Sequence, residues 1–134
     1  LKKAGNRVTY IYCSRGKNYI FGEDEFRSAV DEFLITTDDG SAGLRGFATE
    51  VAAHVISDIK FSRIYTCGPD PMMEKTVKLA NPGAKVEVSV ENYFGCGVGI
   101  CVGCTVDTTD GYVRACVDGP VLDGRKIIWK NMPD

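Results

Sequence analysis

The sequence predicts an α/β fold in which a partial parallel sheet is followed by a small cysteine-rich module with short antiparallel strands. Up to about residue 90, short apolar runs alternate with helical segments, which is typical of parallel strands joined by crossover helices. From about residue 91, glycine and cysteine replace that alternation. We therefore predict two modules, residues 1–90 and residues 91–134.

Composition limits the classes of function. Among the 134 residues, 44% are hydrophobic and 25% are charged, which is typical of a soluble globular protein that buries a core. The net charge of −2 gives no basic footprint, so we expect no nucleic-acid partner. No apolar run approaches the roughly 20 residues that cross a membrane. We expect a cytoplasmic protein without a membrane partner.

The first elements follow from local patterns. Lys2 and Lys3 before Gly5-Asn6 resemble the end of a helix with a left-handed cap, so we expect the natural chain to extend upstream of Leu1. Residues 8–13 (VTYIYC) predict a buried strand in which Cys13 is a buried thiol. A helix over 23–33, with acidic residues at its start, and a strand over 34–37 follow.

The later elements continue the alternation and then end it. The first of them is a helix with Phe47, Val51 and Val55 on one stripe, followed by a strand over 63–67. A helix with Asp70 as its N-cap and Pro71 as its first residue then runs to about residue 81. A strand over 85–90 and a hairpin of 105–108 with 112–116 complete the series.

Three loops follow predicted parallel strands, and ligands bind parallel sheets at this carboxyl edge. The loops are Ser14-Arg15, Asp38-Asp39 and Cys67 to Pro71. The sequence therefore predicts a small-molecule site there.

Four cysteines, Cys96, Cys101, Cys104 and Cys116, have the spacing C-x4-C-x2-C-x11-C. The first three have the separations of plant-type [2Fe–2S] ligands. Glycines between them allow positive φ and let backbone N–H groups approach sulfur. The pattern predicts a [2Fe–2S] cluster and a role in electron transfer.

A structural zinc site also uses four thiolates and is the main alternative for this motif. Its cysteines usually come as two short knuckles far apart in sequence, whereas three of these lie in one glycine-rich loop. Disulfides are less favoured, because the chain has the character of a reduced intracellular protein without a signal peptide.

Two segments resemble known families. CGPDPMM, residues 67–73, resembles the nicotinamide-binding lobe of the ferredoxin–NADP reductase superfamily. VSVENYFGCGVGICVGCTV followed by ACVDGPVLDG resembles the C-terminal part of electron-transfer subunits of dihydroorotate dehydrogenase B, with hydrogenase and sulfur or sulfite reductase subunits as near relatives. Together the resemblance covers essentially the whole chain.

The resemblance implies a role for each matched residue. The four cysteines would bind the iron of the cluster. Cys67, Gly68 and Pro69 would line a nicotinamide pocket with the helix that starts near Asp70. Ser14 and Arg15 would lie by the adenosine half of the dinucleotide. Asp38 would accept a hydrogen bond from a ribose hydroxyl and would therefore favour NAD over NADP. Asp38-Asp39-Gly40 is also an ordinary turn sequence, Arg15 is equally consistent with a solvated loop residue, and Cys67 with a small buried hydrophobe.

The resemblance also implies a division of the chemistry. FAD in the full-length protein would exchange hydride with NAD, and the cluster would pass single electrons to an FMN-containing catalytic subunit in a hetero-oligomer of pyrimidine biosynthesis. The flavin-binding barrel and the glycine-rich pyrophosphate loop of the family are not in this sequence. We therefore expect no FAD and weak NAD binding here, no catalytic acid, base or nucleophile, and an oxidoreductase subunit that is not a complete enzyme. The alternative of another class is a zinc-stabilised binding module without redox activity.

Overall fold

A computed structural model of the chain describes residues 1–129 and contains two compact units, Leu1–Val55 and the part from Ile56 onward. The last residues of the expected second module, 130–134, lie outside the described residues. The expected α/β class, with parallel strands and a short antiparallel hairpin, is confirmed.

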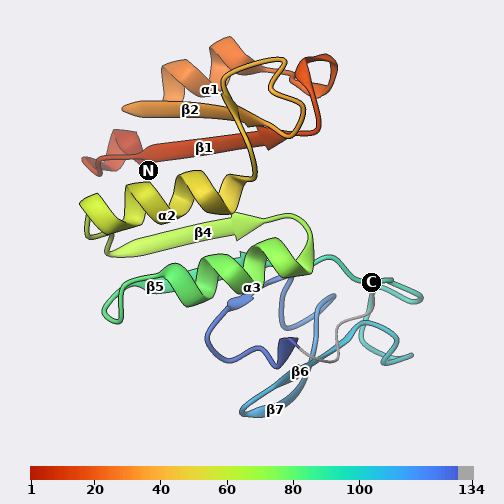
Figure 1. Ribbon diagram of the computed structural model, residues 1–134. Helices are drawn as coiled ribbons and strands as arrows, with labels where there is room; N and C mark the ends of the chain where they lie inside the picture. Colours follow the sequence, from red (N-terminus) through yellow and green to blue (C-terminus); the bar gives the residue numbers. More distant parts are fainter. Residues whose placement is uncertain (130–134) are drawn as a thin grey trace. The chain divides into compact units, whose positions relative to one another are not determined.

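The first unit contains a parallel sheet with strand order β1-β2-β3. Figure 1 shows β1 and β2 side by side. Its strands are β1 (Thr9–Ser14), β2 (Glu32–Thr37) and β3 (Leu44–Arg45). The chain passes from β1 to β2 through a short 3-10 helix, η2 (Lys17–Tyr19), and α1 (Glu23–Ala29). The rings of Tyr10 and Phe26 lie 5.3 Å apart between centroids, so aromatic packing joins α1 to the sheet.

Three expectations for this unit need correction. The helix expected to reach residue 33 ends at Ala29, because Glu32 already pairs with Thr9 in the sheet. Strand β1 is only half-buried, since it is an edge strand with β2 as its neighbour. Cys13 is exposed, because Tyr12 points to the aromatic face and alternation places Cys13 on the opposite face.

The start of the chain has the expected cap. A 3-10 helix, η1 (Lys2–Ala4), ends at Gly5, whose φ of 79° is left-handed and whose N–H donates to the carbonyl of Lys2.

Helix α2 (Ala48–Asp58) buries a different face from the stripe that the sequence predicted. Ala52 and Ile56 are buried, whereas Phe47 precedes the first helical residue and is 64% exposed.

The second unit contains a sheet with strand order β4-β5-β8 and a separate hairpin of β6 with β7. The strands are β4 (Arg63–Cys67), β5 (Lys85–Ser89), β6 (Thr105–Thr108), β7 (Gly111–Arg114) and β8 (Val121–Asp123). Helix α3 (Asp70–Leu79) connects β4 to its parallel neighbour β5 (Figure 1). Strand β8, which pairs antiparallel with β5, was not expected from the sequence.

One core joins the strands on both sides of residue 90. Its fully buried members include Met73 of α3, Val88 of β5, Val106 of β6 and Ala115 after β7. Arg125, after β8, also donates to the carbonyl of Asn81 at 2.7 Å. The division into modules at residue 90 therefore stays a proposal about function, because packing is continuous across it.

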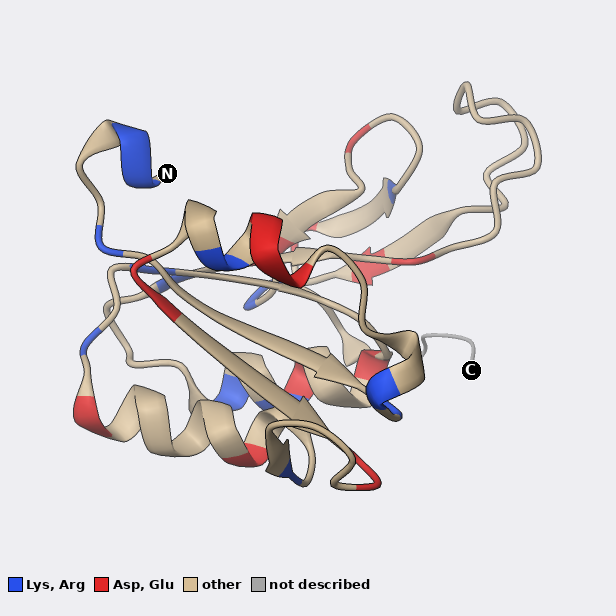
Figure 2. Ribbon diagram, turned by 90° about the horizontal axis from the view of Figure 1, so that it is seen from above, with Lys and Arg blue, Asp and Glu red and all other residues tan. Residues whose placement is uncertain are grey.

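Charged residues of both signs are distributed along the chain (Figure 2). Residues 92–106, however, include no Lys, Arg, Asp or Glu. Among the described residues, no helix has the length and apolar character needed to cross a membrane.

Candidate functional site

The four cysteines of the motif lie in a loop between β5 and β6 and just after β7. The loop has little regular structure, and its backbone reverses direction at Gly97 and Gly99, whose φ values are 69° and 80°. Val102, between two of the cysteines, also has a positive φ of 52°, which is unusual for a β-branched residue. This backbone places N–H groups close to sulfur.

Cys96 is the acceptor of several of these N–H groups. Its sulfur accepts hydrogen bonds from the backbone N–H groups of Val98 at 3.4 Å, Ile100 at 3.3 Å and Cys101 at 3.4 Å. The N–H of Cys101, then that of Val98 and the Cys101 thiol, lower the pKa of Cys96 to about 6. Because hydrogen bonds to the charged form favour it, the loop stabilises a thiolate at Cys96 before any metal binds.

Cys104 and Cys116 form a second pair next to the β6–β7 hairpin. The N–H of Ala115 donates to the carbonyl of Cys104 at 2.9 Å, and the N–H of Cys116 donates to the Cys104 sulfur at 3.4 Å. The pKa of the Cys104 thiol is lowered, first by that N–H and then by the Cys116 thiol. The pKa of Cys116 is raised, because its thiol proton is engaged by Cys104.

The thiols thus form two pairs, Cys96 with Cys101 and Cys104 with Cys116. No three Cys, His, Asp or Glu side chains in the described part of the chain gather closely enough to hold one metal ion. Two thiolate pairs suit a [2Fe–2S] cluster, because each of its two irons takes two protein ligands. The donor set therefore fits that group.

The lowered pKa of Cys96 predicts a distinct alkylation profile for the metal-free protein. When the pH is lowered from 8 to 6.5, the thiolate fraction of a thiol with a pKa of about 6 decreases less than about twofold. The thiolate fraction of an ordinary thiol decreases more than about tenfold over the same range. Desolvation and the charge of Asp38 raise the pKa of Cys13, which provides the control. Iodoacetamide labelling with peptide mass mapping measures both rates, and parallel pH dependences would contradict the assigned Cys96 environment.

The first unit brings Ser14, Arg15 and Asp38 together at the carboxyl end of β1 and β2. The N–H of Asp38 donates to the carbonyl of Ser14 at 3.1 Å, and that of Asp39 to the carbonyl of Arg15 at 3.3 Å. Asp39 closes the turn, because its carboxylate accepts from the N–H of Ser41 at 2.8 Å and from the Ser41 hydroxyl. The turn thus uses the side chain of Asp39 rather than that of Asp38.

The second unit places Cys67, Gly68, Pro69 and Asp70 between β4 and α3. Cys67 is exposed, so its interpretation as a buried hydrophobe is wrong. Gly68 has a φ of 147°, and a Cβ there would lie 2.7 Å from the terminal methyl of Met72. Pro69 is the N-cap of α3, where Asp70 had been expected, and Asp70 is the first helical residue. Their contact with a nucleotide stays a prediction.

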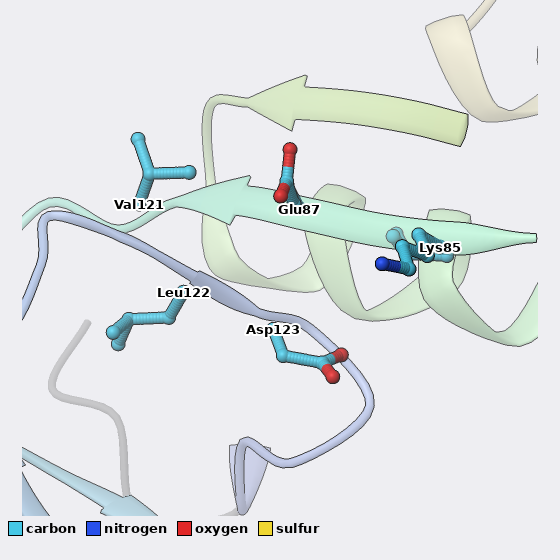
Figure 3. A pocket seen from close by; sticks show the side chains of 6 residues that line it. Lys85, Glu87, Val121, Leu122 and Asp123 are labelled. Carbon is cyan, nitrogen blue, oxygen red and sulfur yellow. The ribbon is translucent and has the colours of Figure 1, made fainter.

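A surface pocket of ≈ 240 Å³ lies along β5 and β8 (Figure 3). It is lined by Lys85, Val86, Glu87, Val121, Leu122 and Asp123. None of the site residues expected from the sequence lines this pocket.

Sequence reasoning missed Arg114, whose guanidinium donates to the carbonyl of Gly99 inside the cysteine loop at 3.1 Å. The available signal was a cation two residues before the fourth cysteine, beside a loop that has no charge of its own.

Comparison with known proteins gives a consistent result. Residues 91–128 match the family model of the iron–sulfur cluster binding domain of dihydroorotate dehydrogenase B. A protein of Methanocaldococcus jannaschii named "Probable dihydroorotate dehydrogenase B (NAD(+)), electron transfer subunit" is 44% identical over 126 residues, 93% of this chain and 48% of the relative. The corresponding subunit of Bacillus pumilus is 35% identical over 130 residues, 95% of this chain and 49% of the relative.

A solved structure is also similar. It is described as that of an NADH-dependent reduced ferredoxin-NADP oxidoreductase, in work on flavin-based electron bifurcation. Its chain has a TM-score of 0.82 and 34% identity, with 96% of this chain and 46% of that chain covered. This chain thus spans about half the length of the relatives that it matches.

Proposed function

We propose, from the match of residues 91–128 to the family model of the iron–sulfur cluster binding domain of dihydroorotate dehydrogenase B, that this chain relays single electrons within an electron transfer subunit of that enzyme. The observation that carries the proposal is the arrangement of four cysteine thiols in two pairs, three of them in a charge-free, glycine-rich loop and the fourth just after β7.

Each pair of thiols has a defined task in this proposal. Cys96 and Cys101 would hold one iron of a [2Fe–2S] cluster, and Cys104 and Cys116 would hold the other. When bound, such a cluster supplies one-electron transfer, whereas a nicotinamide carries two electrons as a hydride. The N–H groups of Val98 and Ile100 stabilise negative charge on sulfur, which increases when the site is reduced.

The wider role concerns the whole protein. The names of the relatives include NAD(+), which supports binding of NAD by the full-length protein. Cys67 to Asp70 in one unit, and Ser14, Arg15 and Asp38 in the other, stay the residues predicted to contact it. FAD in the full-length protein would convert hydride into single electrons. An FMN-containing catalytic subunit would receive them in a cytoplasmic hetero-oligomer that serves pyrimidine biosynthesis.

Electron transfer between purified proteins tests the proposed partner. At least two equivalents of the chain, reconstituted with iron and sulfide and then reduced, are mixed anaerobically with one equivalent of the FMN-containing subunit of dihydroorotate dehydrogenase B from the same source, because each cluster supplies one electron and the flavin takes two. We expect the visible absorbance of oxidised FMN to be lost after mixing with the loaded chain, while the apo chain causes no loss. No bleaching by the loaded chain would contradict this partner.

The similarity to the ferredoxin-NADP oxidoreductase structure supports a second candidate, in which the partner is a flavoprotein of that type. The same mixing experiment distinguishes the two candidates. Bleaching of the oxidoreductase flavoprotein but not of the FMN subunit would favour the second.

Asp38 offers a test of the nucleotide site in the full-length protein. Because a carboxylate accepts from a ribose hydroxyl and repels a 2′-phosphate, we expect Asp38→Ala to weaken NAD⁺ binding about tenfold and to leave NADP⁺ binding unchanged or stronger. Calorimetric titration measures both affinities. Asp24→Ala, in the first turn of α1, is the matched control. Equal affinities in Asp38→Ala and the unmodified protein would remove Asp38 from the site.

A further inference from the structure

We propose that Arg114 is a positioning residue that raises the reduction potential of the cluster by holding its guanidinium against the cysteine loop. The inference rests on the proposed function, because it concerns the potential of the proposed cluster. It adds a residue that neither the cysteine motif nor the family match identifies.

Arg114 reaches the loop from the end of β7. Its guanidinium donates to the carbonyl of Gly99 at 3.1 Å, and this hydrogen bond is partly buried. Gly99 lies between Cys96 and Cys101, and Cys116 follows Arg114 by two residues. Arg114 therefore connects the segment of the first two ligands with the segment of the fourth.

Asp118 fixes this side chain from the other side. Its carboxylate accepts the backbone N–H of Arg114 at 2.8 Å and lies 3.5 Å from Nε of the guanidinium. The N–H groups of Val117 and Asp118 both donate to the carbonyl of Arg114, which closes a tight turn around Cys116. Because both charged side chains are about 40% exposed, their ion pair contributes little to stability.

Because glycine has no Cβ, Gly99 leaves room for this contact. A Cβ at Gly99 would lie 2.8 Å from a methyl of Val117 and 3.1 Å from a guanidinium nitrogen of Arg114. The φ of 80° at Gly99 also belongs to the left-handed region that favours glycine. Glycine at position 99 therefore suits both the left-handed backbone and the close approach of Arg114.

The charge of Arg114 has a predictable effect on the cluster. Residues 92–106 carry no ionisable Lys, Arg, Asp or Glu, so no other cation lies within the loop itself. Reduction adds one negative charge to a [2Fe–2S] site, and a fixed cation stabilises the reduced form more than the oxidised form. Arg114 should raise the potential, and Asp118 should lower it.

Redox titration of reconstituted variants, followed by electron paramagnetic resonance, tests the proposal. We expect Arg114→Gln to decrease the ratio of reduced to oxidised cluster at a fixed potential about tenfold, which is 59 mV for a one-electron couple. Asp118→Asn should shift the ratio in the opposite direction, and Arg114→Lys should retain most of the unmodified value. Arg63→Gln, on β4, is the control for loss of a surface cation.

Opposite shifts in Arg114→Gln and Asp118→Asn support the proposal. Equal potentials in these variants and the unmodified chain overturn it, as do shifts in the same direction, which would indicate a purely structural turn. If Arg114→Gln retains no cluster, the potentials of Arg114→Lys and Asp118→Asn decide by the same criteria. An unmodified chain that binds no iron and sulfide would instead contradict the proposed function.

Discussion

Replacing Cys101 or Cys104 by serine is expected to remove the [2Fe–2S] cluster, with bound iron and acid-labile sulfide falling below about a tenth of the unmodified value. Each substitution leaves one thiolate pair with a single ligand, and a serine hydroxyl is a poor substitute for a thiolate. Cys101 is exposed, so its loss tests ligation with little direct cost to the core. Metal analysis and the visible absorption spectrum after reconstitution measure the result.

Cys104→Ser should have a second effect, because Cys104 is only 2% exposed and belongs to the core. Metal binding in a small module is also folding energy, so residues from 91 onward should become more susceptible to hydrogen exchange in both variants. Cys13→Ser is the matched control, since Cys13 lies in β1 of the other unit. Full iron and sulfide content in both ligand variants would sink the assignment of these cysteines.

Introducing a lysine at Ile100 or Val98 is expected to weaken assembly with the catalytic partner at least about tenfold while leaving the cluster spectrum unchanged. The side chains of Val98, Ile100 and Val102 are 65%, 82% and 61% exposed, although all are apolar. Val102 keeps this exposure in a backbone conformation that β-branched residues rarely adopt. Such an apolar patch beside a redox centre is typical of an interaction surface.

Size-exclusion chromatography and calorimetry with the FMN-containing subunit measure the assembly of the full-length protein. Tyr112→Lys is the control, because Tyr112 is 79% exposed on β7 but lies outside the cysteine loop. Shielding of the cluster from water is the alternative role for the patch. If Val98→Lys and Ile100→Lys assemble normally but shorten the lifetime of the cluster in air, that alternative is correct.

Local patterns predicted most of the elements that surround the site. The strand at residues 63–67 was predicted with its observed bounds, because a short β-branched and aromatic run is followed immediately by Gly-Pro. The cysteine spacing predicted the proposed iron ligands without knowledge of the fold. Helix α1 was predicted too long, because pairing of Glu32 with Thr9 is a tertiary effect that the helical spacing does not reveal.

Other features depend on contacts between distant segments. Strand β8 has only three residues and forms because Leu122 lies opposite Val88, which a local pattern does not show. Arg114 could be seen as a cation near a cysteine, but its contact with Gly99 requires the loop to turn back toward β7. The grouping of the thiols into pairs also depends on that turn, and the spacing gives only the set of four.

The most direct test is the electron paramagnetic resonance spectrum of the reconstituted chain after reduction with dithionite, recorded together with its iron, sulfide and zinc content. The account predicts about two irons and two sulfides per chain, no signal in the oxidised protein, and about one unpaired spin per chain after reduction. A colourless chain with one zinc ion and no paramagnetic signal after reduction would contradict it and identify a zinc-stabilised module instead.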